Sequence, residues 1–235
     1  MSLHLTSIQD FSVTDVLALA RLAIDLSRCT GCYACMIACK SENSTLPGVL
    51  WIRIEEKEEG EFPKVSKTWI PMLCMQCAEM PCAQVCPTGA ITRGEGGIVL
   101  IDSQSCICEG VKPCVSACPF GVLLVNQGNR SYFRDYLTPH EKQDYEAHAE
   151  GAVEKCDLCH HRVIAGMQPS CVQACPSKAM LFGDLDEPAS DLVELVSSKE
   201  AKALRDDLKL DPSVFYVNKS PAEAENETPL AGGQS

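Results

Sequence analysis

Sixteen cysteines carry most of the chemistry that this 235-residue sequence can perform. They fall into four groups of four, and in every group three residues separate the last two cysteines. The groups are Cys29, Cys32, Cys35 and Cys39; Cys74, Cys77, Cys82 and Cys86; Cys106, Cys108, Cys114 and Cys118; and Cys156, Cys159, Cys171 and Cys175. Proline follows the last cysteine in three of the groups, so the pattern is an internal repeat.

The spacing within each group predicts iron–sulfur clusters. Three thiolates from one tight loop can bind three iron corners of a cubane cluster, which leaves the fourth corner open. A cysteine four positions further along a short helix lies about 6 Å away, so its sulfur reaches a neighbouring cluster. The fourth cysteine of the bacterial ferredoxin run binds the other cluster in this way. We therefore expect the groups to work in pairs that exchange their fourth ligands.

Zinc is the main alternative to iron–sulfur chemistry. The fourth group alone matches a C-x2-C plus C-x3-C zinc ribbon. The other groups concentrate at least three cysteines within nine residues, however, and soft thiolates at that density favour iron–sulfur clusters. Cysteines separated by two residues make poor partners for a structural disulfide. A zinc-structured interaction module remains the alternative without redox chemistry.

The composition excludes several classes of function. The formal net charge of −12 makes nucleic acid an unexpected partner. No uninterrupted apolar run approaches the length of a membrane span. The N-terminal segment carries Asp10 and Asp15 and no basic leader, so we expect no signal peptide. No phosphate-binding glycine loop, nucleophile elbow or HExxH motif is present, and we predict no catalytic residues.

Short strands are expected on both sides of the cysteine groups. Residues 21–29 and 97–106 are typical of strands that lead into cluster loops, and GAI after Pro87 and GVLLVN after Pro119 of strands that leave them. This β–loop–α–β repeat predicts an α+β fold of two bacterial-ferredoxin-like double-cluster units. A helix is expected over residues 191–208.

Several segments carry a resemblance to a known family. Cys29 to Cys39 followed by KSEN, then LCMQCAEMPCAQVCPTGAI, CVSACPFGV and EKCDLCHHRVIAGMQPSCVQACPSKAMLFGDLDEP stand in the order found in one class of proteins. The chain resembles the four-cluster subunit of molybdopterin oxidoreductases, such as dimethyl sulfoxide, polysulfide, arsenate and tetrathionate reductases and formate dehydrogenase. The resemblance runs from about Arg21 to Val217.

The resemblance implies an electron-transfer subunit without substrate chemistry of its own. It would carry single electrons between a molybdenum or tungsten bis-pterin catalytic subunit and a second redox partner, which is a membrane anchor or another electron carrier. A subunit of a hydrogenase or formate–hydrogen system is the alternative. Such subunits are often exported folded with a twin-arginine partner, so a periplasmic location is favoured over a cytoplasmic one.

The resemblance also implies crossed ligand sets for four 4Fe-4S clusters. The expected sets are Cys29, Cys32, Cys35 and Cys175; Cys156, Cys159, Cys171 and Cys39; Cys74, Cys77, Cys82 and Cys118; and Cys106, Cys108, Cys114 and Cys86. His160 and His161 are candidates for tuning a cluster or for plain surface packing. No tryptophan replaces a cysteine, so we expect no 3Fe-4S centre.

Crossed ligands imply a discontinuous outer unit wrapped around an inner one. The expected segments are an N-terminal extension (1–20), the first part of the outer unit (21–67), the inner unit (68–127), an exposed insertion (128–151), the second part of the outer unit (152–190), a C-terminal helix and strand (191–217) and a disordered tail (218–235).

The third group departs from the common spacing. A single residue separates Cys106 from Cys108, and five residues precede Cys114. In an extended segment, residues two apart point to the same side about 6.5 Å apart, so both sulfurs can reach one cluster. By resemblance, this cluster lies farthest from the catalytic subunit, and the altered loop adapts it to a particular redox partner. A neutral insertion with normal ligation is the alternative.

Changing Cys108 to serine tests whether Cys108 is a ligand. We expect Cys108→Ser to remove or convert one cluster and to block exchange with the external partner. Electron transfer between the substrate site and the first cluster should survive. Iron analysis and turnover with that partner measure the outcome, and four intact clusters with full turnover would contradict the prediction.

Overall fold

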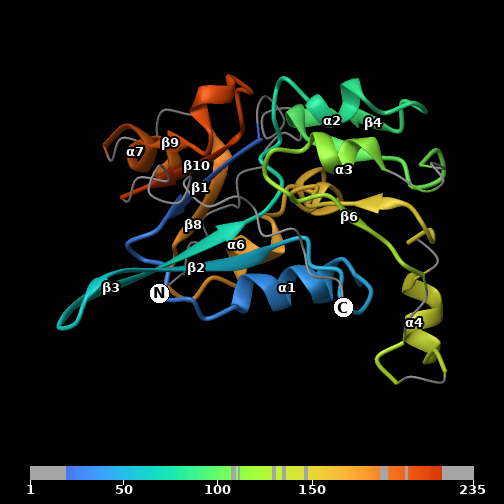
Figure 1. Ribbon diagram of the computed structural model, residues 1–235, viewed down its shortest axis with the longest axis horizontal. Coiled ribbons are helices and arrows are strands. Elements are labelled where there is room, and N and C mark those ends of the chain that lie inside the picture. The colour runs from blue at the N-terminus through green and yellow to red at the C-terminus, as the bar shows by residue number, and fades with distance from the viewer. Residues whose placement is uncertain are drawn as a thin grey trace, which may run out of the picture.

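The computed structural model is a mixed arrangement of helices and strands (Figure 1). It describes residues 20–106, 110, 112–128, 131–133, 136–145, 148–185, 190–198 and 201–218. The segment before residue 20, Cys108 and the expected tail beyond residue 218 lie outside the described residues. Within the described part of the chain, no helix has the length and apolar character needed to cross a membrane.

A four-stranded sheet joins the beginning and the end of the described chain. Its strands lie in the order β8 (Met180–Asp184), β1 (Ala20–Asp25), β10 (Val214–Val217) and β9 (Lys202–Ala203). β1 runs antiparallel to β8 and parallel to β10, and β9 runs antiparallel to β10. All side chains of β1 except Arg21 are buried, which explains its nearly continuous apolar sequence.

Helix α7 (Asp191–Ser198) packs on this sheet. Its Leu192 and Leu195 form a small buried cluster with Ala23 and Val217. Apolar residues three apart share one face of a helix, so this contact uses the amphipathic pattern of the segment. Among the described residues, this small cluster between the sheet and α7 contains no cysteine.

The helix expected over residues 191–208 is shorter than predicted. It ends at Ser198, and β9 and the 3-10 turn η3 (Asp206–Leu208) occupy part of the remaining segment. The backbone of β9 pairs with β10, and this pairing competes with helix formation. Arg205 has a left-handed backbone with φ 54°, which is incompatible with a continuing helix.

Four short helices pack as two pairs. α1 (Ala34–Glu42) packs against α6 (Ser170–Gln173), and α2 (Pro81–Gln84) packs against α3 (Pro113–Ala117). In Figure 1 the first pair lies in the lower half of the molecule and the second pair at the upper right. The helix of the first cysteine group therefore lies against that of the fourth, and the helix of the second group against that of the third.

The short strands predicted beside the cysteine groups are confirmed. β4 (Ile91–Arg93) and β5 (Val99–Ile101) form an antiparallel hairpin through the 3-10 turn η1 (Glu95–Gly97). β6 (Leu124–Val125) pairs antiparallel with β7 (Val153–Glu154). The first hairpin connects the second cysteine group to the third, and the second pairing connects the third group to the fourth.

A long hairpin projects from the body of the molecule. It consists of β2 (Arg53–Glu61) and β3 (Lys64–Met72), and its tip extends to the left in Figure 1. Phe62 at the tip is 93% exposed. At the other end, Trp69 lies so close to Gly31 that a β-carbon at position 31 would overlap the indole ring. The hairpin therefore packs directly on the loop of the first cysteine group.

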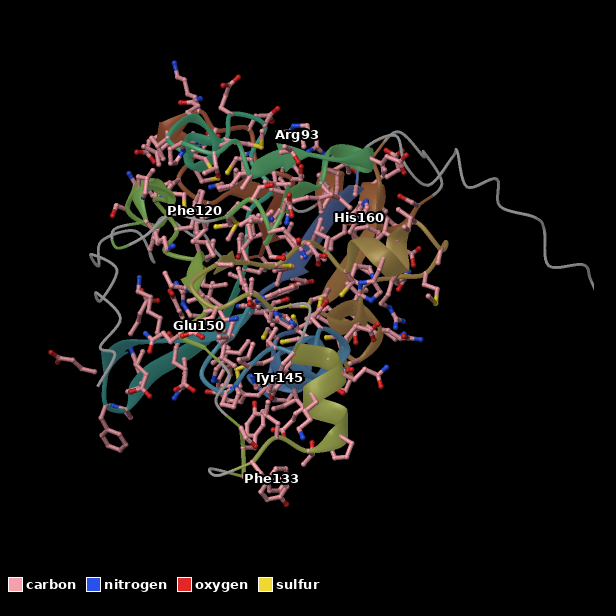
Figure 2. All side chains as sticks on the ribbon, turned by 90° about the vertical axis from the view of Figure 1, so that its right-hand side faces the viewer. Arg93, Phe120, Phe133, Tyr145, Glu150 and His160 are labelled. Atoms are coloured by element: carbon pink, nitrogen blue, oxygen red, sulfur yellow. The ribbon has the colours of Figure 1, made fainter. Side chains whose placement is uncertain are left out.

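The segment expected as an exposed insertion is partly buried. Helix α4 (Pro139–Asp144) begins with a capping box that uses the Glu141 carboxylate, and Glu141 is buried. Tyr145 packs in a small core with Leu46. Figure 2 shows Tyr145 toward the body and Phe133 at the outer end, where it is exposed. The polar composition of the segment concealed these anchoring contacts.

Cysteine side chains form a large part of the main hydrophobic core. Sulfur atoms are spread through the interior in Figure 2. The buried cysteines of this core are Cys35, Cys39, Cys74, Cys106, Cys114, Cys156 and Cys171. The helices and most of the strands around them are short, so the packing of these loops depends strongly on the cysteine sites.

Removing iron is therefore expected to disrupt most of the fold. Chelation under reducing conditions should abolish the cooperative thermal transition measured by circular dichroism, because the thiol-rich loops then lose their cross-links. Reconstitution of the same sample with iron and sulfide should restore the transition, which controls for damage by the chelator. An unchanged transition after complete iron removal would contradict the prediction.

Candidate metal centres

Charge repulsion between thiolates indicates which cysteines face each other. Burial raises the pKa of the Cys35 thiol to about 12, and the neighbouring Cys29, Cys175 and Cys32 contribute to the rise. The pKa of Cys29 in turn is raised by burial and by Cys175 and Cys32. We call Cys29, Cys32, Cys35 and Cys175 the Cys29 set. Three of its members come from one loop, and Cys175 comes from the far end of the chain.

A second set gathers around Cys156. Burial raises the pKa of Cys156 well above its usual value, and Cys39 and Cys171 raise it further. The pKa of Cys39 is raised by burial and by Cys171 and Cys159. We call Cys39, Cys156, Cys159 and Cys171 the Cys156 set, and all four thiols are buried. Cys35 also raises the pKa of Cys171, so this set adjoins the Cys29 set.

A third set is centred on the second cysteine group. Burial raises the pKa of Cys77 to about 12, and Cys74, Cys118 and Cys82 contribute to the rise. We call these four residues the Cys74 set. Cys118 is contributed by the third cysteine group and directly follows the last residue of α3.

The fourth set contains three described thiols. Burial raises the pKa of Cys114, and Cys106 and Cys86 raise it further. We call Cys86, Cys106 and Cys114 the Cys106 set. Cys108, the remaining residue expected here, lies outside the described residues.

Each group uses the same helix start to position its third cysteine. Cys35, Cys82, Cys114 and Cys171 are the second residues of α1, α2, α3 and α6. The next backbone amide donates a hydrogen bond to the sulfur, in the pairs Met36–Cys35, Ala83–Cys82, Val115–Cys114 and Val172–Cys171. Free amides at a helix start favour a thiolate, because they are unpaired donors with partial positive charge.

The loops before these helices share a left-handed residue. Gly31, Gln76 and Leu158 each precede the second cysteine of their group, with φ of 64°, 52° and 54°. Gly31 takes this conformation without strain, but the other two cost roughly 1 kcal/mol or more each. Gln76 is fully buried, and its side chain donates to the Cys156 carbonyl at 2.8 Å and accepts from the Val99 amide at 2.7 Å.

Two of the cysteines that precede proline have a hydroxyl neighbour. Ser177 lies 3.6 Å from the Cys175 sulfur, and Thr88 lies 3.6 Å from the Cys86 sulfur. Burial alone would raise the pKa of Cys175, but hydrogen bonds from Ser177 and from backbone amides lower it overall. The pKa of Cys86 is lowered in the same way through Thr88. The repeated Cys-Pro-Ser/Thr sequence is the signal that could have revealed these donors.

Asn43 connects two thiols of the Cys156 set. Its side-chain nitrogen lies 3.5 Å from the Cys39 sulfur and 4.0 Å from the Cys159 sulfur. The Val153 amide similarly donates to Cys106 at 3.3 Å. Polar donors of this kind stabilise negative charge on sulfur. No spacing rule predicts the contacts of Asn43 with Cys159 and of Val153 with Cys106, because these partners are distant in the chain.

The two histidines of α5 (His160–Val163) bind no described thiol. His161 pairs with Glu42 at 2.9 Å, and the pKa of Glu42 is lowered mainly by this hydrogen bond. The Nε2 atom of His160 is buried and has no hydrogen-bond partner among the described residues. The Glu42 contact holds α5 against the end of α1, which favours a structural role for His161.

The donor sets fit iron–sulfur clusters. Among the described residues, no group of three or more His, Cys, Asp or Glu side chains converges on a site for a single metal ion. A cluster instead takes one thiolate at each of four iron corners. Buried thiols with raised pKa values lose their protons when they bind iron, so cluster assembly would release protons and relieve the repulsion within each set.

Comparisons with known proteins agree with this chemistry. A 4Fe-4S dicluster domain model matches residues 65–134 and 135–185, and a second 4Fe-4S dicluster domain model matches residues 28–90. Each dicluster domain binds two clusters. The predicted cofactors, four 4Fe-4S clusters, are confirmed.

Relatives cover most of the chain. It is 35% identical over 232 residues to the arsenate respiratory reductase iron-sulfur subunit of Shewanella sp. strain ANA-3, covering 83% of this chain and 94% of the relative. It is 38% identical over 211 residues to a selenate reductase subunit of Mesobacillus selenatarsenatis, covering 83% and 70%. It is 34% identical over 230 residues to the menaquinone reductase iron-sulfur cluster-binding subunit of Nitratidesulfovibrio vulgaris, covering 84% and 88%.

The hydroxyl donors give a testable effect on redox potential. Ser177→Ala and Thr88→Val should each lower the midpoint potential of one cluster, because reduction adds negative charge that the lost hydrogen bond stabilised. One neutral hydrogen bond is worth about 1 kcal/mol, which is tens of millivolts for one electron. Redox titration monitored by electron paramagnetic resonance measures the shift.

Ser170→Ala is the matched control for these variants. Ser170 is adjacent to Cys171, but its hydroxyl donates to the Ala38 carbonyl at 3.3 Å instead of to a sulfur. Its removal should leave all four potentials unchanged. Equal shifts in the control and in Ser177→Ala would show that the hydroxyl–sulfur contact does not set the potential.

Proposed function

Because the chain belongs to the family of four-cluster iron–sulfur electron-transfer subunits of molybdopterin oxidoreductases, we propose that it serves a molybdenum or tungsten bis-pterin catalytic subunit. It carries single electrons between that subunit and a second redox partner. The chain is a non-catalytic member of an oxidoreductase complex, as its relatives are named as iron–sulfur subunits of reductases. These names do not favour the hydrogenase or zinc alternatives.

The serial arrangement of the four sets carries this proposal. The Cys29 set adjoins the Cys156 set, because Cys35 acts on the pKa of Cys171. The Cys156 set adjoins the Cys74 set, because Gln76 binds the Cys156 carbonyl. The Cys74 and Cys106 sets meet along α2 and α3. Four centres in a row are suited to passing electrons one at a time.

The crossed ligand assignment forms part of the proposal. In it, Cys175 completes the cluster of the first group and Cys39 that of the fourth. Cys118 completes the cluster of the second group and Cys86 that of the third. The electrostatic neighbours of Cys35, Cys39, Cys77 and Cys114 support these assignments.

A discontinuous outer ferredoxin-like unit follows from the same assignment. The outer unit combines residues 21–67 with 152–190, and the inner unit spans residues 68–127. The pairing of β1 with β8 and the packing of α1 on α6 support the outer unit. The pairing of β4 with β5 and the packing of α2 on α3 support the inner unit.

The two ends of the series have different partners in this proposal. The Cys29 set faces the catalytic subunit, and the Cys106 set faces the second redox partner, a membrane anchor or another electron carrier. Exposure of Cys32 supports contact at the first end, and complete burial of the Cys156 set supports an internal position for it. Export of the folded complex with a twin-arginine partner to the periplasm completes the proposal and rests on the family resemblance.

Copurification from the native host tests the function. The complex should contain a larger subunit with molybdenum or tungsten, detected by elemental analysis, and an organic pterin, detected by fluorescence after oxidation. The clusters should be reoxidised when the catalytic subunit is supplied with its electron acceptor. A complex without metal-bound pterin, or clusters that never exchange electrons with it, would contradict the proposal.

Paired cysteine variants test the crossed ligands. Cys39→Ala and Cys159→Ala should each remove about four iron atoms, and the double variant should remove no more, because both residues hold one cluster. The double variant Cys39→Ala/Cys32→Ala should instead remove about eight. If Cys39→Ala/Cys32→Ala instead removed only about four iron atoms, Cys39 and Cys32 would hold the same cluster, and each group would keep its own fourth cysteine.

A further inference from the structure

A buried lysine lies between the inner and outer cysteine groups. Lys155 is 3% exposed and immediately precedes Cys156. Its ammonium group donates to the Val99 carbonyl and, at 3.0 Å, to the Cys156 carbonyl. Gln76 binds the amide of Val99 and the same Cys156 carbonyl. The two side chains thus bracket one junction between the loops of the second and fourth groups.

The ammonium group is hydrogen-bonded to loops beside both neighbouring sets. It is hydrogen-bonded to the backbone of Cys156, a member of the Cys156 set. It is also hydrogen-bonded to the carbonyl of Val99, whose amide donates to Gln76, the residue between Cys74 and Cys77 of the Cys74 set. Lys155 therefore places one positive charge between the two central members of the series.

No described carboxylate neutralises this charge. Lys155 forms no ion pair among the described residues, and its two acceptors are neutral carbonyls. The adjacent acids have other partners, since Glu154 accepts from Trp51 and pairs with His148, and Asp157 accepts from the Cys159 amide. A buried ammonium without a counter-charge is costly, so a negatively charged group nearby would stabilise it.

We propose that Lys155 is the shared counter-charge of the two central clusters and sets their redox potentials. This inference rests on the ligand sets proposed above. A 4Fe-4S cluster with four thiolates is negatively charged, and each reduction adds one more negative charge. A fixed positive charge nearby stabilises the reduced form, so Lys155 keeps both central clusters reducible within the low-dielectric interior.

The size of the effect is measurable. A unit charge about 10 Å away, in an effective dielectric constant of about 20, changes the equilibrium constant for adding one electron by roughly tenfold. A tenfold change corresponds to about 59 mV for a one-electron couple. The charge should act on two clusters, whereas a local hydrogen bond to one carbonyl should act on one at most.

Three substitutions separate charge from hydrogen bonding. Lys155→Gln keeps donors for the two carbonyls and removes the charge, Lys155→Met removes both, and Lys155→Arg keeps the charge. The full chain, loaded with clusters, is titrated anaerobically with electron paramagnetic resonance detection. Lys178→Met is the matched control, because Lys178 lies near the ligand Cys175 but is exposed, so solvent screens its charge.

The expected result is a loss of reducibility confined to two clusters. Lys155→Gln and Lys155→Met should both lower the midpoint potentials of two clusters, which corresponds to a roughly tenfold smaller equilibrium constant for adding one electron to each. Lys155→Arg and Lys178→Met should keep potentials close to those of the parent protein. If Lys155→Gln and Lys155→Met fail to assemble clusters but Lys155→Arg assembles all four, the result also supports the role of Lys155 as a counter-charge.

Other results overturn the inference. Unchanged potentials in Lys155→Gln show that the charge is irrelevant, and a shift in Lys155→Met alone assigns the effect to hydrogen bonding. Failure of all three variants to assemble clusters assigns Lys155 a packing role. These measurements need no partner subunit, so they stand apart from a failure of the proposed electron transfer, which appears only in the complex.

Discussion

The structure depends on one constraint: cysteine thiols must be buried together and must then carry negative charge. Burial raises the pKa of nearly every core cysteine for which a shift is resolved, and neighbouring thiolates raise it further, as for Cys35 and Cys156. Without iron, these side chains would remain protonated and only weakly attracted to each other. Iron removes the repulsion and joins distant segments, which is why strands of two or three residues suffice around the sites.

The chain meets this constraint by repeating one local structure. A left-handed residue turns the loop, the third cysteine enters a helix at its second position, and the next amide reaches its sulfur. The fourth cysteine then lies about one helical turn further, within reach of the next set. Gln76 and Leu158 adopt the left-handed conformation at a cost that glycine avoids. Gln76 offsets that cost through its two buried hydrogen bonds, which connect separate cysteine loops.

The sequence predicts the features that depend on local spacing. Four cysteine groups, the short strands beside them and the cofactor type all follow from residues close together in the chain. The predicted length of the helix after Asp191 was wrong because the pairing of β9 with β10 is a long-range contact. Asn43, Gln76 and Lys155 were missed for the same reason, since each acts on residues far away in the sequence or on main-chain atoms. The ligand sets and the role of Cys108 stay predictions.

The two kinds of donor act at thiols that differ in solvent access. In the proposed ligand sets, the hydroxyl groups of Ser177 and Thr88 act on the two ends of the series, where Cys32 is exposed and Cys86 is partly exposed. Water near Cys32 and Cys86 already stabilises added charge, so a hydrogen bond suffices for fine adjustment there. The Cys156 set is buried, and there each added electron meets a low dielectric constant and the charge of its neighbours. A full positive charge at Lys155 matches that larger requirement, and it prevents the middle of the series from becoming the barrier to electron flow.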